Sequence, residues 1–138
     1  MVQTLDRLTI DNSTIANSNS AMGVGDDGMY FESQNSAVMK LTISNSHFTA
    51  ARADLIQTNA LNNSTMDIVV TNTEFKNNNA AILSGGGGTT FSGGGTGSTA
   101  TVTFNISGNT FRDSRGHAIN VFKGTGTANF SGTISNNT

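Results

Sequence analysis

Cysteine, proline and tryptophan are absent from the 138 residues, and only 12% of the residues are charged. The absence of cysteine fits bacterial surface proteins as well as many cytosolic ones, so it leaves the compartment open. The seven basic residues are scattered and the net charge is −2, which argues against a nucleic-acid partner. The longest apolar runs are four or five residues, too short for a helix that crosses a membrane.

The composition is instead dominated by small polar residues. Asn, Thr, Ser and Gly supply half of the chain. A disordered chain of this polarity would be rich in charge and proline and poor in β-branched residues, whereas here Val, Ile, Thr and Phe occur in short clusters. Thr favours strands, and Asn and Gly suit tight turns with positive φ. The sequence therefore predicts short strands, sharp turns and little helix.

One phrase recurs about every thirty residues: LTIDNSTI from Leu8, LTISNSHF from Leu41, IVVTNTEF from Ile68 and FNISGNTF from Phe104. Stacking the copies predicts one ladder of inward aliphatic residues, Ile10, Ile43, Val70, Ile106 and Ile134, and a second of Ile15, Phe48, Phe75 and Phe111. A bend is expected between them at Asn12, Asn45, Asn72, Gly108 and Asn136, where the asparagines are expected to stack as an amide ladder. A third strand is expected near Met22, Leu55, Ile82 and Ile119.

A repeat of this length with three short strands predicts a solenoid. Leucine-rich and helical repeats need helix-length segments, and a β-propeller blade needs a fourth strand. We therefore expect an all-β fold: a right-handed, single-stranded parallel β-helix of about four to five coils with open ends. Residues 1–138 would form one segment of a larger solenoid or a stacking unit, and residues 84–101 a Gly-rich loop insertion.

Two strings carry a family resemblance: FKNN from Phe75 followed by AAIL from Ala80, and FRDS from Phe111 followed by GHAI from Gly116. They resemble the FxxN and GGA(I/L/V) repeats of chlamydial-type polymorphic outer-membrane proteins. More broadly, the units are similar to the β-helix repeats of autotransporter passengers and pectate-lyase-like proteins. The resemblance implies a bacterial protein that is extracellular or at the cell surface. MVQTLDRLTI does not read as a signal peptide, so a targeting segment is expected outside these residues.

Two clusters are candidates for chemistry. Asp26 and Asp27 form an adjacent acidic pair that could serve polysaccharide cleavage or bind Ca²⁺, although a type I′ turn on Asp-Gly explains DDG without any function and is favoured. Arg115 and His117 belong to the densest polar cluster, FRDSRGHAI, but the aligned residues of other coils, 77–80 and 49–53, supply no acid ladder. We expect solvated turns at both places, with no metal and no cofactor.

The sequence thus favours a non-catalytic structural or adhesive β-helix segment. One alternative binds or cleaves polysaccharide, and another is a subunit that stacks on itself into an extracellular fibre. The expected partners are other β-helix coils or copies of the chain at the open ends, and a carbohydrate or host-surface ligand. Ice binding would need Thr-x-Thr in register between coils, and occurrences such as those at residues 71–73, 101–103 and 125–127 do not align.

Overall fold

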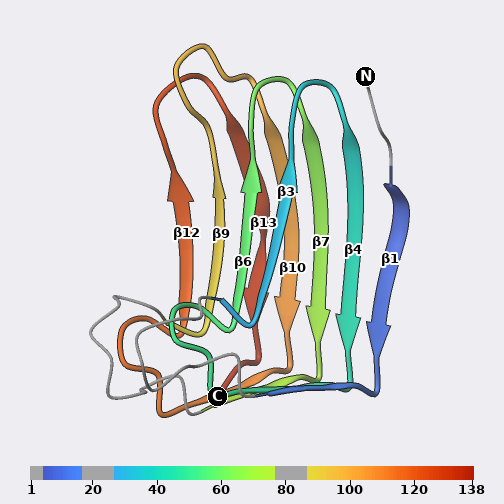
Figure 1. Ribbon diagram of the computed structural model, residues 1–138, viewed down its shortest axis with the longest axis vertical. Helices are drawn as coiled ribbons and strands as arrows, with labels where there is room; N and C mark the ends of the chain where they lie inside the picture. The colour runs from blue at the N-terminus through green and yellow to red at the C-terminus, as the bar shows by residue number, and fades with distance from the viewer. Residues whose placement is uncertain (1–4, 17–26, 77–86) are drawn as a thin grey trace.

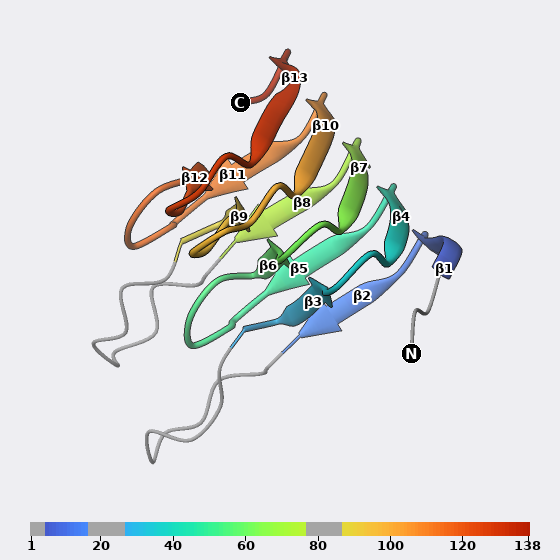
Figure 2. The same cartoon turned by 90° about the horizontal axis from the view of Figure 1, so that it is seen from above.

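The computed structural model describes residues 5–16, 27–76 and 87–138, which form a parallel β-solenoid. Its thirteen strands make four coils of three strands each, followed by the first strand of a fifth coil. Figure 2 shows the coils stacked one above the next from the N-terminal to the C-terminal end. The described residues contain no helix, and so none of a length and apolarity that would span a membrane.

Each coil contributes one strand to each of three parallel sheets. The first sheet holds β1 (Leu5–Asp11), β4 (Val38–Ser44), β7 (Thr65–Thr71), β10 (Thr101–Ser107) and β13 (Asn129–Ser135), which lie side by side in Figure 1. The second sheet holds β2 (Thr14–Ala16), β5 (His47–Thr49), β8 (Glu74–Lys76) and β11 (Thr110–Arg112). The third sheet holds β3 (Met29–Ser33), β6 (Ile56–Ala60), β9 (Thr89–Gly93) and β12 (Ile119–Lys123).

The pairing registers place equivalent residues of the repeated phrase next to one another. Ile10 pairs with Ile43, Ile43 with Val70, and Val70 with Ile106, which in turn pairs with Ile134. The second sheet pairs Ile15, Phe48, Phe75 and Phe111 in the same way. These are the two ladders that the stacked phrases predict. The ladders point inward, because Ile43, Val70, Ile106, Phe48 and Phe75 are all fully buried.

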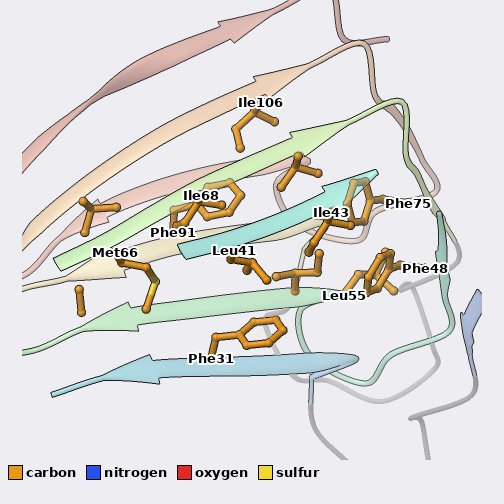
Figure 3. Packing of buried hydrophobic residues seen from close by; sticks show 14 of the residues in the cluster. Phe31, Leu41, Ile43, Phe48, Leu55, Met66, Ile68, Phe75, Phe91 and Ile106 are labelled. Atoms are coloured by element: carbon orange, nitrogen blue, oxygen red, sulfur yellow. The ribbon is translucent and has the colours of Figure 1, made fainter. Parts of the chain in front are cut away.

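The core lies between the three sheets, as the labelled side chains of Figure 3 show. Phe75 stacks on Phe48 on one side and on Phe111 on the other, with ring centroids 5.3 and 4.9 Å apart. The third sheet adds Phe31 and Phe91 to this core. Each buried aromatic side chain contributes roughly 1.5–3 kcal/mol through removal from water, so stacked coils stabilise one another through continuous apolar rows.

The corner between the first and second sheets is built by one residue with positive φ. Asn12, Asn45, Asn72, Gly108 and Asn136 have φ between 47° and 68°. Asparagine and glycine tolerate this left-handed conformation better than other residues, which explains their place in the phrase. Their backbone N–H groups continue the hydrogen bonds between coils, as when Asn45 donates to Thr71 O. The four asparagine side chains at the corner are exposed.

A ladder of polar side chains lies one residue further along, and the sequence did not predict it. The backbone N–H of Ser13 donates to Ser46 Oγ, that of Ser46 to Thr73 Oγ1, and that of Thr73 to Asn109 Oδ1. Asn109 N–H continues the ladder to Asn137 Oδ1. Ser46 and Thr73 are buried, so Thr73 Oγ1 and Asn109 Oδ1 each supply a partner to a backbone donor that water cannot reach.

Two expectations about the third sheet are wrong. Residues 84–101 are not one loop, because β9 lies within this range with all five of its residues buried. In the first and third coils the third-sheet strand begins at Met29 and Thr89, whereas it was expected near Met22 and Ile82, which lie outside the described residues. The reason is that 12 residues separate the second-sheet and third-sheet strands in these coils, against 6 in the second and fourth.

The polar ladder yields a stability prediction for Asn109. Its side chain accepts a hydrogen bond from Thr73 N–H and donates to Val70 O, both at 2.9 Å. Asn109→Ala should therefore lower the free energy of unfolding by about 2–4 kcal/mol, because two buried backbone groups lose their partners. The exposed Asn105→Ala should change it by less than about 1 kcal/mol. Equal losses in urea denaturation for the two variants would contradict this role of the ladder.

Candidate functional site

The outer face of the third sheet carries two rows of side chains that the strands place at fixed spacing. Residues two and four of each strand point outward, while residues one and three face the core. The pairing registers give one row of Tyr30, Gln57, Thr90 and Asn120, and a second row of Glu32, Asn59, Ser92 and Phe122. Amide, hydroxyl and aromatic side chains are thereby repeated at about 4.8 Å from coil to coil.

The members of these rows in the second, third and fourth coils line a groove of about 540 Å³, which we name the third-sheet groove. Its walls are Gln57, Asn59, Thr90, Ser92, Asn120 and Phe122, together with residues of the turns that follow β6, β9 and β12. Gly93, Gly94, Gly95 and Gly124 contribute to these turns, so backbone lines the groove on that side. The volume falls within the range of small-molecule sites in proteins.

Two aromatic side chains are exposed on this face. Phe122 is 57% exposed and lines the groove in the fourth coil. Tyr30 is 50% exposed and lies in the first coil, beside Gln57. The folded chain therefore presents flat apolar rings beside amide and hydroxyl groups, a combination typical of surfaces that bind ligands with both apolar and polar faces.

Glu32 is held by a hydrogen-bond network on β3, one strand beyond the groove wall at Asn59. Tyr30 Oη donates to Glu32 Oε2 at 2.5 Å, and the Gln34 amide donates to Oε1. Asn59 Nδ2 lies 3.3 Å from Glu32 Oε2 and 3.4 Å from Tyr30 Oη. The hydrogen bonds from Tyr30 and Gln34 lower the pKa of Glu32, and burial opposes them. Burial, followed by the bond to Glu32, raises the pKa of Tyr30, so the neutral phenol is the donor.

A column of equivalent positions lies where each coil enters the third sheet, two residues before the strand of that coil. The column holds Asp27, Asp54, Gly87 and His117. Asp54 N–H donates to Asp27 Oδ1 at 2.9 Å, and Gly87 N–H donates to Asp54 Oδ1 at 2.6 Å. The alignment that paired His117 with residues 77–80 and 49–53 is therefore wrong, because Asp54 and Asp27 occupy its position in earlier coils. Connectors of unequal length hid the match with Asp27, whereas Asp54 follows a connector of the same length and lies just past the aligned residues 49–53.

His117 reaches from the fourth coil toward the second. Its Nε2 lies 3.0 Å from Thr90 Oγ1 and 3.6 Å from Asp54 Oδ1. The ring passes over Gly87, where an added Cβ would lie 2.6 Å from His117 Cδ2. Glycine thus makes room for the histidine at this position. The same nitrogen faces both neighbours, so the arrangement differs from a catalytic triad, in which the two ring nitrogens contact different partners.

The other candidates from the sequence are distributed as follows. Asp26 lies outside the described residues, so only Asp27 of the acidic pair is placed. Neither Asp27 nor Gly28 has positive φ, so the expected type I′ turn on these residues is wrong. Gly28 is required instead for close approach, because a Cβ there would lie 2.4 Å from Leu55 O. Arg115 is exposed in the turn between β11 and β12. Across the described ranges, no three His, Asp or Glu side chains are grouped to hold a metal ion.

A separate charged cluster lies on the outer face of the second sheet. Glu74 contacts His47 Nδ1 at 3.2 Å and Lys76 Nζ at 2.9 Å through Oε2, and it also pairs with Arg112. His47, Lys76 and Arg112 come from three successive coils. Since one carboxylate is shared among them, the cluster acts as a bridge between strands and is a weaker ligand candidate than the groove.

The groove residues were missed by sequence reasoning for a specific reason. With 84–101 taken as a loop, TTFSG was not recognised as the counterpart of MYFES, IQTNA and INVFK. A search for five-residue segments with an apolar or small residue at positions one and three would have aligned all four. That alignment places Phe122 in the same row as Ser92 and Asn59.

The chain matches no known family model, no curated protein and no solved structure in the comparisons. What the chain does must therefore be argued from the geometry of its own residues. The repeat motifs and the parallel solenoid agree with each other on the fold class.

The position of His117 over Gly87 yields a second prediction. Gly87→Ala should destabilise the fold by about 1–3 kcal/mol, because the new Cβ would overlap both the ring and His117 O. The control Gly124→Ala has its nearest neighbour at 3.5 Å and should cost less. In a His117→Ala background, Gly87→Ala should cost less than in the wild type, as measured by urea denaturation. An unchanged cost would show that the ring does not fill this space.

Proposed function

We propose that this chain is a non-catalytic, adhesive β-solenoid segment that binds carbohydrate in the third-sheet groove. The observation that carries the proposal is the exposed Phe122 ring in a groove that is also lined by the amides of Asn120, Asn59 and Gln57. A pyranose ring has one face of C–H groups that packs on an aromatic ring, and hydroxyl groups at its edge that both donate and accept hydrogen bonds. Asparagine and glutamine amides can satisfy both kinds of group.

The direction of the groove favours a polymer over a single sugar. Its walls come from β6, β9 and β12, so it runs from coil to coil along the stack. The spacing of about 4.8 Å between strands is close to the length of one sugar residue in an extended chain. An extended glycan laid along the stack could therefore meet an equivalent pair of side chains at each step.

The carboxylates of the column support a binding role over a catalytic one. Asp27 and Asp54 each accept a backbone N–H from the following coil, which gives both a structural task. Glycoside hydrolysis typically needs two carboxyl groups facing each other across the scissile bond. The surface-display part of the proposal rests on the resemblance of the repeats to those of autotransporter passengers and related outer-membrane proteins.

Substitution of the aromatic platform tests the proposal. Phe122→Ala should weaken binding of a soluble polysaccharide roughly tenfold or more, because the sugar loses its apolar contact. Asn120→Ala should weaken it less, through the loss of hydrogen bonds. Binding can be measured by isothermal titration calorimetry after an array of plant, bacterial and host glycans has identified the best ligand.

Ile134→Ala serves as the matched control. Ile134 is 49% exposed but belongs to the first sheet, so its truncation removes apolar surface away from the groove. The control should bind glycan like the wild type. If no glycan on the array binds, or if Phe122→Ala binds as tightly as the control, the proposed function is wrong.

Polysaccharide cleavage is the second candidate, because Thr90 joins the groove to the pair of His117 and Asp54. We expect no release of reducing ends or unsaturated products when the wild type is incubated with the glycans that it binds. The measurement is a reducing-end assay together with absorbance of unsaturated uronates. Cleavage that disappears in both Asp54→Asn and His117→Gln would establish the enzyme in place of the adhesive segment.

A further inference from the structure

We infer that Glu32 makes the third-sheet groove selective for uncharged glycans over polyuronates. This inference rests on the proposed function, because it names the class of carbohydrate that the same groove accepts. It concerns β3 of the first coil, which pairs with the groove strand β6 and carries the only carboxylate of the two outward rows.

The pairing register fixes the position of Glu32 relative to the aromatic platform. Glu32 pairs with Asn59, Asn59 with Ser92, and Ser92 with Phe122. Glu32 and Phe122 therefore lie at opposite ends of one row, three coils or about 14 Å apart. A glycan that stacks on Phe122 and follows the row reaches Asn59, whose amide is 3.3 Å from the Glu32 carboxylate. A uronate residue at that step would bring a second carboxylate close to Glu32.

The Glu32 carboxylate is oriented and ionised. Tyr30 Oη and the Gln34 amide each hold one of its oxygens, so the side chain cannot easily turn away from an incoming anion. These hydrogen bonds also lower its pKa, which keeps the carboxylate charged at neutral pH. Repulsion between two carboxylates at a partly exposed site corresponds to roughly a three- to tenfold loss of affinity.

The other charged groups near the groove do not offset this repulsion. Lys123 follows Phe122 on β12, but strand alternation directs it to the opposite face of the sheet, at the position of Gly93 and Ala60. His117 lies just before the start of β12, where its ring contacts Thr90 and lies next to the Asp54 carboxylate. The charge along the row of Phe122 is therefore set by Glu32.

The test compares hexamers of β-1,4-linked glucose, xylose and mannose with hexamers of galacturonate and mannuronate. The wild type should bind at least one uncharged hexamer about three- to tenfold more tightly than either uronate hexamer. Glu32→Gln should improve uronate binding about three- to tenfold and change uncharged binding by less than about twofold. Asp67→Asn removes the same charge from the first sheet and should leave the preference unchanged. Raising the salt concentration should reduce the discrimination of the wild type but not that of Glu32→Gln.

The outcomes separate the two proposals. If uncharged hexamers bind in a manner that depends on Phe122, but Glu32→Gln leaves the preference unchanged, the selectivity inference is overturned and the proposed function stands. Tighter binding of uronate hexamers than of uncharged hexamers by the wild type would likewise overturn the selectivity inference and leave the proposed function standing. If no hexamer and no longer glycan binds, the proposed function is wrong and the selectivity inference falls with it.

Discussion

The register between coils depends on the corner that follows each first-sheet strand. One residue with positive φ turns the chain there, and the next side chain bonds a backbone N–H of the preceding coil. This hydrogen bond joins equivalent positions of two neighbouring coils. A slip of one residue would move every apolar side chain to the opposite face. The Phe48–Phe75–Phe111 stack and the outward rows of the third sheet keep their alignment only while the corner does.

Length variation is tolerated where it does not disturb this register. The connectors between the second and third sheets alternate between 12 and 6 residues, so the repeating unit is better described as a pair of coils. Each coil nevertheless re-enters the third sheet at the same level, because Gly28, Gly87 and Gly88 let the backbone approach a carbonyl oxygen of the following coil. An added Cβ would lie 2.3–2.4 Å from that oxygen at each position. Glycine therefore allows connectors of different length to end in one column.

The sequence predicted the parts of the coil whose spacing is constant. The spacing along the sequence from Ile43 through Asn45 to Phe48 is the same in the four complete copies of the phrase. The strands, the corner and the two ladders therefore followed from alignment alone. The third sheet follows connectors of unequal length, and its inward residues vary between Phe91, Thr58 and Val121 in one row. Spacing therefore located its strands only in the second and fourth coils, near Leu55 and Ile119, and the groove on its outer face was missed. Contacts between side chains of different coils, such as those of the polar ladder, also cannot be inferred from the sequence of a single strand.

The outer faces of the first and third sheets differ in a way that bears on function. On the first sheet, hydroxyl and carboxylate side chains bond one another across coils, as Thr103 does with Asp67 and Ser44 with Asp11. Their hydrogen-bonding capacity is used within the fold. On the third sheet some polar side chains, such as Asn59 and Ser92, are also bonded within the fold, but Phe122 exposes its ring beside Asn120. The pairing of the strands fixes the distance between these side chains. A ligand with matching spacing would therefore immobilise few additional side chains on binding. A preorganised surface of this kind reaches useful affinity from few contacts.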